Sequence, residues 1–222
     1  MRLLLVSLLA GCATAGTEQP STGMDAAVDG SLIDAPDAPL PCNEIITELL
    51  KNPAFDTDPV GTLWMQTPIN PTYPLITGMG QTGTSGITEQ SAPYDAWLGG
   101  LAGTDTLWQD ITVPARTRLL ALSGFYEVRS SDSTTVPIDT GTLAFVQTND
   151  SPIAVAQAVD NTKRTTTWTT INYAVSNAET LSGMTIRVKM TTTNNAPINP
   201  LTGQGITSFW WDTLSVKATH CM

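Results

Sequence analysis

The sequence has little of the side-chain chemistry that many hydrolases use. Its 222 residues include a single histidine, His220, which lies beside Cys221 near the end of the chain. A histidine-based catalytic triad or a zincin motif cannot be assembled from one terminal histidine. The glycine-rich stretch at residues 78–83 is not followed by a helical pattern, which argues against a phosphate-binding loop. A carboxylate pair of the glycosidase type stays open in principle, although no pair of acids stands out by its spacing.

Positive charge is also scarce. Ten Lys and Arg residues stand against twenty Asp and Glu residues, which gives a net charge of −10. Binding to nucleic acid depends on clustered basic side chains that displace counterions from phosphates. This chain offers only isolated pairs such as Lys163-Arg164. The composition therefore disfavours nucleic acid as a partner.

The first apolar run of the chain is too short to span a membrane. Residues 3–11 follow a single positive charge at Arg2 and end in small residues, which is the layout of a secretion signal. A spanning helix needs about 20 apolar residues, roughly twice what this run supplies. We expect residues 1–11 to be a signal peptide that is removed.

The four residues Leu9-Ala10-Gly11-Cys12 resemble the lipobox of bacterial lipoproteins. The resemblance implies cleavage before Cys12 and a lipid on that cysteine, and two acyl chains already hold a protein stably on a bilayer. Ala13 stands where an Asp would favour retention at the inner membrane of Gram-negative lipoproteins. The expected location is the outer membrane or cell surface; the alternative is an ordinary signal peptide with a chance cysteine.

After Cys12 the sequence has the composition of a linker. Residues 12–41 contain five acids, no base and repeated Ala, Pro, Gly and Ser. A segment of this kind cannot bury enough apolar surface to fold. We interpret residues 12–41 as a lipidated cysteine followed by an acidic spacer.

The remaining two cysteines flank the last segment, residues 42–222. Its length suits one domain with a proper core, and we expect that domain to be monomeric. Cys42 and Cys221 form an even pair in an exported protein, which predicts a disulfide between the two ends of the domain. The alternative is a pair of free thiols.

Strand signals dominate this domain. Short runs rich in Val, Ile, Thr and aromatic residues alternate with clusters of Gly, Pro, Asn and Asp, and residues 184–190 alternate strictly between apolar and polar. Residues 44–50 are helix-like or form an opening strand. The pattern predicts an all-β antiparallel sandwich. The other expected strands are 107–113, 119–128, 142–147, 153–159, 168–175 and 208–216.

Several short motifs resemble, in order, those of galactose-binding-like jelly rolls, the fold of many carbohydrate-binding modules. The resemblance covers nearly all of residues 43–220 and implies a jelly-roll β-sandwich. The matching motifs are Asn52-Pro53-Ala54-Phe55-Asp56 with Trp64, residues 96–100, residues 107–115, residues 182–190 and residues 208–216.

The same resemblance implies a structural Ca²⁺ near the first and last strands. Asp56 and Asp212 occupy the corresponding positions, and carboxylate oxygens suit this hard cation. Here Asp56 replaces the family's Glu, and Thr213 replaces its second Asp. The alternative is that both acids cap turns or face solvent.

The six tryptophans suit either a core or a sugar-stacking surface. Trp64, Trp108 and Trp168 lie at positions that are structural in the family, so we expect them in the core. Trp210 and Trp211 must point to opposite faces of their strand, so one ring packs inward and the other is a candidate for sugar binding. The remaining candidate ligand-binding residues are Tyr73, Tyr94 and Trp97.

These features favour a cell-envelope lipoprotein that displays a non-catalytic binding module for a glycan or extracellular matrix. One alternative is a structural lipoprotein that docks an envelope protein and has no sugar ligand. A minor alternative is a carboxylate-based enzyme acting on glycans. A polysaccharide is thus the expected partner in the first case and an envelope protein in the second.

Overall fold

The computed structural model describes residues 42–57, 63–78, 87–195 and 205–222. The predicted signal peptide, Cys12 and the linker lie outside these residues, so those expectations stay predictions. Within the described ranges the chain forms strands and one short 3₁₀ turn, η1 (Ala178–Leu181). No helix in this part of the chain is long and apolar enough to cross a membrane.

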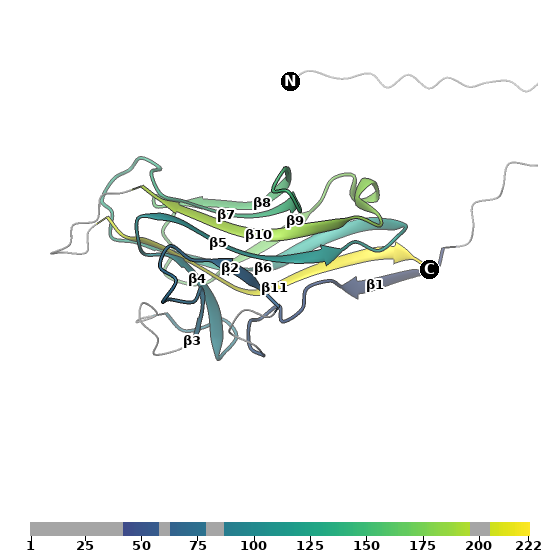
Figure 1. Cartoon of the computed structure of the whole chain (residues 1–222), viewed down its shortest axis with the longest axis horizontal. Coiled ribbons are helices and arrows are strands. Elements are labelled where there is room, and N and C mark those ends of the chain that lie inside the picture. Colours follow the sequence, from purple (N-terminus) through teal and green to yellow (C-terminus); the bar gives the residue numbers. More distant parts are fainter. Residues whose placement is uncertain (1–41, 58–62, 79–86, 196–204) are drawn as a thin grey trace, which may run out of the picture. The chain divides into compact units, whose positions relative to one another are not determined.

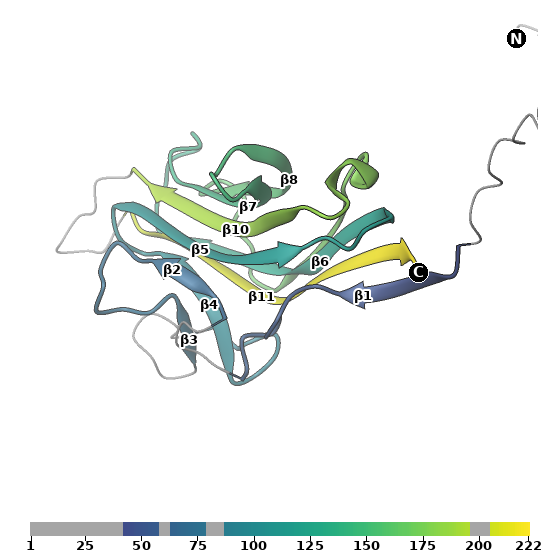
Figure 2. The ribbon, with the colours of Figure 1, turned by 45° about the vertical axis from the view of Figure 1, so that its right-hand side comes forward.

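The strands form two antiparallel sheets that pack face to face (Figures 1 and 2). Sheet A has the order β3-β4-β11-β6-β9, with β1 also paired to β11. Its strands are β1 (Glu44–Glu48), β3 (Ile76–Gly78), β4 (Tyr94–Gly99), β6 (Thr117–Ser130), β9 (Thr169–Ala174) and β11 (Thr207–Cys221). Sheet B has the order β2-β5-β10-β7-β8. Its strands are β2 (Met65–Thr67), β5 (Gly103–Thr112), β7 (Thr140–Gln147), β8 (Pro152–Asp160) and β10 (Thr185–Asn194).

This architecture confirms the predicted all-β antiparallel sandwich. Each predicted strand is present, several with longer bounds, and residues 44–48 form a strand rather than a helix. The strands β2, β3 and β4 are not among the predicted ones. For β2 and β3 the reason is their length, because three residues are too few to show an alternating pattern.

The core lies between the sheets and is built by the alternation of side chains along each strand. On β10, Ile186, Val188 and Met190 are fully buried, whereas the residues between them face outward. On β11, Phe209 and Trp211 point into the core, and a bulge between Asp212 and Ser215 shifts the register. After the bulge, the inward residues are Leu214, Val216 and Ala218. This shift keeps a fifteen-residue strand facing the core along its length.

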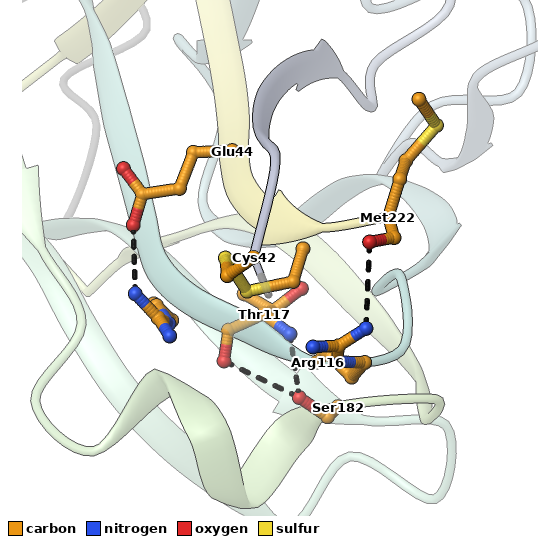
Figure 3. The surroundings of a disulfide bond; sticks show 8 residues. Cys42, Glu44, Arg116, Thr117, Ser182 and Met222 are labelled. Atoms are coloured by element: carbon orange, nitrogen blue, oxygen red, sulfur yellow. Dashed lines mark hydrogen bonds and ion pairs between the residues drawn. A yellow bond between two sulfur atoms is a disulfide. The ribbon is translucent and has the colours of Figure 1, made fainter. Parts of the chain in front are cut away.

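A disulfide joins the two ends of the domain, as predicted. Cys42 and Cys221 have Cα atoms 5.0 Å apart and are separated by 179 positions in the sequence. Figure 3 shows hydrogen bonds near the bridge, including those between Thr117 and Ser182 and from Arg116 to the Met222 carbonyl. The first and last strands of the domain therefore lie side by side, as β1 pairs along the end of β11.

Candidate functional site

Two of the predicted aromatic candidates meet in one open cleft. Tyr73, in the β2–β3 loop, and Trp97, on β4, both line it together with Leu101. The cleft is shallow, with a cavity volume of about 30 Å³, and it opens to solvent. Tyr73 is 47% exposed and Leu101 is also exposed, so apolar surface remains accessible here. The other lining residues are Pro68, Asn70, Pro74, Leu75, Gly99 and Asp105.

A buried carboxylate holds the walls of this cleft. One Asp105 oxygen accepts the Ile69 N–H at 2.6 Å, and the other accepts the Gly99 N–H at 2.8 Å. Burial raises the pKa of Asp105, while these two N–H groups lower it. Because both oxygens are occupied, Asp105 fixes the β2–β3 loop against the end of β4. The cleft is therefore rigid at its base and open at Tyr73.

Trp97 continues from the cleft onto the outer face of sheet A. Its ring is stacked on that of Trp210, with centroids 6.5 Å apart and planes 13° apart. Trp210 lies between Trp97 and Glu127 in the strand register. Trp210 is only 3% exposed, although it points away from the core. The outer face of sheet A is therefore covered at this point.

Residues 87–91, here called the covering segment, lie over this face. The Ser91 N–H donates to Asp212 Oδ2 at 2.7 Å. Trp168 Nε1 donates to the Thr88 carbonyl at 2.8 Å, and the Thr213 hydroxyl donates to Gln90 Oε1 at 2.9 Å. The segment thus spans from β11 to the residue that precedes β9.

Four carboxyl groups are buried beneath or within this cover: Glu89, Asp95, Glu127 and Asp212. Burial raises the pKa of Asp95 to about 7, and the nearby Asp212, Glu89 and Glu127 add to the rise. Burial also raises the pKa of Asp212 to about 7, against the opposing effect of the Ser91 and Thr213 N–H groups. Arg129, at 2.7 Å from Glu127, is the base that pairs with this group. The outer face of sheet A therefore carries buried acidic side chains at this point, and it is not an open polar surface.

The structure brings the two predicted calcium ligands together. Ser91 bridges them, since its hydroxyl donates to Asp56 Oδ2 at 3.1 Å and its N–H donates to Asp212. Asp56 Oδ1 is buried and has no hydrogen-bond partner among the described residues. However, in the described ranges no three His, Cys, Asp or Glu side chains gather to hold a metal ion. These residues supply only part of the six to eight oxygens that Ca²⁺ takes, and calcium stays a prediction.

The other aromatic candidates are less accessible. Trp211 is fully buried in the core, so it cannot contact a sugar. Trp210 points outward as the alternation requires, but it is only 3% exposed, so its ring is not accessible to a sugar. Tyr94 is half-buried and packs against the core. Of the five candidates, Tyr73 and Trp97 are the two that share an open cleft.

Three tryptophans were expected in the core, and the structure places one of them there. Trp64 is 1% exposed and packs against Phe55. Trp108 is half-buried on the outer face of sheet B, under the Arg187 guanidinium at 5.1 Å from the ring centroid. Trp168 is half-buried and anchors the covering segment. For Trp108 and Trp168 the core expectation is wrong.

The sequence pattern does not mark Glu89, Asp95 and Glu127 as buried carboxyls. Two of these acids do lie within apolar strand patterns. Asp95 precedes Ala96 and Leu98, and Glu127 lies between Tyr126 and Val128. Acids inside such runs usually face solvent on an antiparallel sheet. The pattern gives no sign of the loop that covers this face.

No protein-family model matches the chain, and no curated protein matches it. Several solved structures are similar to this chain. The TmCBM61 module in complex with β-1,4-galactotriose has 12% identity and a TM-score of 0.46, and the match covers 77% of this chain and 97% of that one. A cyclase from Fischerella sp. TAU has 11% identity and a TM-score of 0.46, covering 79% of this chain and 99% of that one. An arabinose-bound α-L-arabinofuranosidase has 16% identity and a TM-score of 0.44, covering 77% of this chain but 26% of that longer one.

Proposed function

We propose that this protein is a lipid-anchored envelope protein whose β-sandwich binds a glycan in the cleft between Tyr73 and Trp97. The observation that carries the proposal is the meeting of these two rings, from a loop and a strand, in one solvent-open space. Aromatic faces stack on the apolar faces of sugar rings, and the polar edges of a sugar then need hydrogen-bonding groups nearby. Asn70 at the rim and the backbone of the β2–β3 loop supply such groups.

The lining of the cleft favours a neutral glycan. None of its described lining residues is a base, and its one acid, Asp105, is buried and has both oxygens bonded to N–H groups. A charged sugar would lose hydration on entering without gaining a paired charge. The protein therefore selects by ring stacking and shape, as a non-catalytic module does.

The test is binding of the purified protein to a panel of soluble polysaccharides in affinity gels, followed by calorimetry with the best ligand. Tyr73→Ala and Trp97→Ala should each weaken binding about tenfold or more, the effect of losing roughly 1.4 kcal/mol of stacking. Trp108→Ala is the matched control, since this ring is also half-buried but lies on the other sheet. A blank panel would contradict glycan binding and favour docking to an envelope protein.

A specific observation also supports the enzyme alternative. Asp95 and Asp212 are buried acids whose pKa values rise to about 7, and the stacked rings of Trp97 and Trp210 lie on the same face. Acid–base glycan cleavage needs one protonated and one ionised carboxyl, and the charge of Asp212, which raises the Asp95 pKa, favours protonation of one of the two. Against this role, a substrate cannot reach Asp95 or Asp212 unless the covering segment moves, because they are 1% and 0% exposed.

Release of reducing sugar from the best-bound polysaccharide, lost in both Asp95→Asn and Asp212→Asn, would establish an enzyme. Binding without release, retained in Asp95→Asn, would support the non-catalytic module.

The lipid anchor is proposed from the Leu9-Ala10-Gly11-Cys12 motif. Mass spectrometry of the amino-terminal peptide should find acyl chains on Cys12, and the Cys12→Ser variant should lose them and leave the membrane fraction. An unmodified Cys12 in membrane-bound protein would contradict the anchor.

A further inference from the structure

Threonines form a regular array on the outer face of sheet B. The neighbouring strands β5, β10 and β7 each carry two threonines separated by one residue, and the strand register aligns them. On β2, Thr67 extends one row because it is paired with Thr106. The threonine array consists of the row Thr67, Thr106, Thr191 and Thr142 and the row Thr104, Thr193 and Thr140.

All of these side chains point away from the core. The residues between the paired threonines, Asp105, Gly141 and Thr192, are buried, so the alternation of a strand places the threonines outside. Three threonines at the edges or ends of the array, Thr67, Thr104 and Thr140, are exposed. The other four are half-buried by their neighbours. The array is therefore a solvent-facing surface.

The geometry of a sheet fixes the repeat of this surface in two directions. Neighbouring strands lie about 4.8 Å apart, and residues two apart on a strand are separated by about 6.7 Å. Each threonine presents one methyl and one hydroxyl, and a hydroxyl has one donor and two acceptor positions. Thr104 and Thr193 lie 3.1 Å apart at their oxygens, which uses one donor and leaves acceptor positions facing outward.

Charge and aromatic rings lie outside the two rows. The ion pairs of Arg187 and Lys189 with Asp110 and Asp150 occupy the other end of this face. Trp108, which adjoins the array, has one ring face under the Arg187 guanidinium. At the β8 border, the Asp160 carboxylate is bonded to Thr162 and lies 3.8 Å from Lys163. The array therefore lacks the stacking ring that a sugar site uses, and the paired charges that bind ions.

We propose that the threonine array is an ice-binding surface. Ice is an uncharged ligand that repeats in two dimensions and presents donors and acceptors equally, and hydroxyl groups can exchange both kinds of hydrogen bond with it. The intervening methyl groups order the water next to them instead of competing for its hydrogen bonds.

A purely structural account of the array makes a different prediction. Threonine favours strands, and cross-strand threonine pairs stabilise sheets by roughly 0.2 to 1 kcal/mol. On that account, replacing a threonine changes stability and nothing else. On ours, a substitution in the array removes ice binding from a protein that is still folded.

The test is retention of the purified protein in slowly growing ice, with ice recrystallisation as the second readout. Thr104→Lys places a charge in the array, and ice cannot solvate it. Thr112→Lys is the matched control, because Thr112 is also exposed on β5 and also faces a β10 threonine, Thr185, at 3.4 Å between hydroxyls. Melting midpoints of both variants report on folding.

We expect retention of the unmodified protein and of Thr112→Lys, and loss of retention in Thr104→Lys. Exclusion of the unmodified protein from ice would overturn the proposal, as would equal retention of the two variants. Adsorption to crystalline cellulose or chitin but not to ice would also overturn it. Because Tyr73 lies outside the array, Tyr73→Ala should keep ice retention whether or not the cleft binds a glycan.

Discussion

Replacing Asp95 by Asn should make the protein more stable at pH 8 and leave its stability nearly unchanged at pH 4. Asp95 is 1% exposed, and its Oδ1 accepts a hydrogen bond from the Thr77 hydroxyl at 3.4 Å. Its ionised form is therefore costly in the folded protein, because water and counter-charges are both lacking. Asparagine has nearly the same shape and no charge.

The magnitude follows from the shift in pKa. In the folded protein the Asp95 pKa rises from its ordinary 3.8 to about 7, so the folded state binds a proton that the unfolded state has lost between these values. Stability therefore falls as pH rises through this window. At 1.36 kcal/mol per unit, the total is about 4 kcal/mol, all of which the Asn variant avoids at pH 8. For a domain of this size that is a rise of roughly 10 °C in melting temperature.

The assay is urea unfolding followed by tryptophan fluorescence at pH 4 and pH 8, in chelator to keep divalent cations away. Glu179→Gln is the control, since Glu179 is exposed in the 3₁₀ turn. Between pH 4 and pH 8, the free energy of unfolding of Glu179→Gln should change by the same amount as that of the unmodified protein. An Asp95→Asn variant whose effect on stability is the same at both pH values would refute the reasoning.

The other predictions concern the disulfide, a loop anchor and calcium. Replacing Cys42 and Cys221 by Ser frees a loop of nearly the whole domain and should cost up to about 5 kcal/mol, measured by urea unfolding against the oxidised unmodified protein. A reduced sample of the unmodified protein is the control and should unfold like the variant. Gln109→Ala removes three hydrogen bonds to the Lys51 and Leu63 backbones and should cost about 3 kcal/mol in the same assay. If Asp56 and Asp212 bind Ca²⁺, metal analysis of the dialysed protein should find one equivalent, and the melting temperature should fall in chelator. The Asp212→Asn variant should show neither property. Dialysed protein without calcium would contradict the prediction.

The sequence predicts the sandwich well because its long strands alternate. Residues 184–190 show this most clearly, with Ile186, Val188 and Met190 all buried as the pattern requires. The disulfide is equally predictable, since only two cysteines flank the domain. The alternating pattern of a strand and the number of cysteines can both be read directly from the sequence.

The candidate site is harder to predict because it depends on which face a loop covers. The alternation correctly separates Trp210 from Trp211, but it cannot show that the outward ring is buried on a face where the covering segment is hydrogen-bonded to Asp212. The same cover turns Asp95 from a surface acid into a buried one. For Trp108, the position in the chain suggested a core ring, whereas the register places it outward beside Lys189. Long-range packing of a loop leaves no periodic trace in the sequence.

If the proposed lipid anchor holds the protein by its amino-terminal side, the disulfide has a mechanical consequence. A pull on the chain ahead of Cys42 passes through the sulfur bridge to Cys221 as well as into β1. It therefore reaches β11, which is hydrogen-bonded to β1, β4 and β6. The first strand cannot be peeled away alone, because its end is fixed to the centre of the sheet. Flow or tension acting on a bound particle would then load many hydrogen bonds together, in place of one strand at a time.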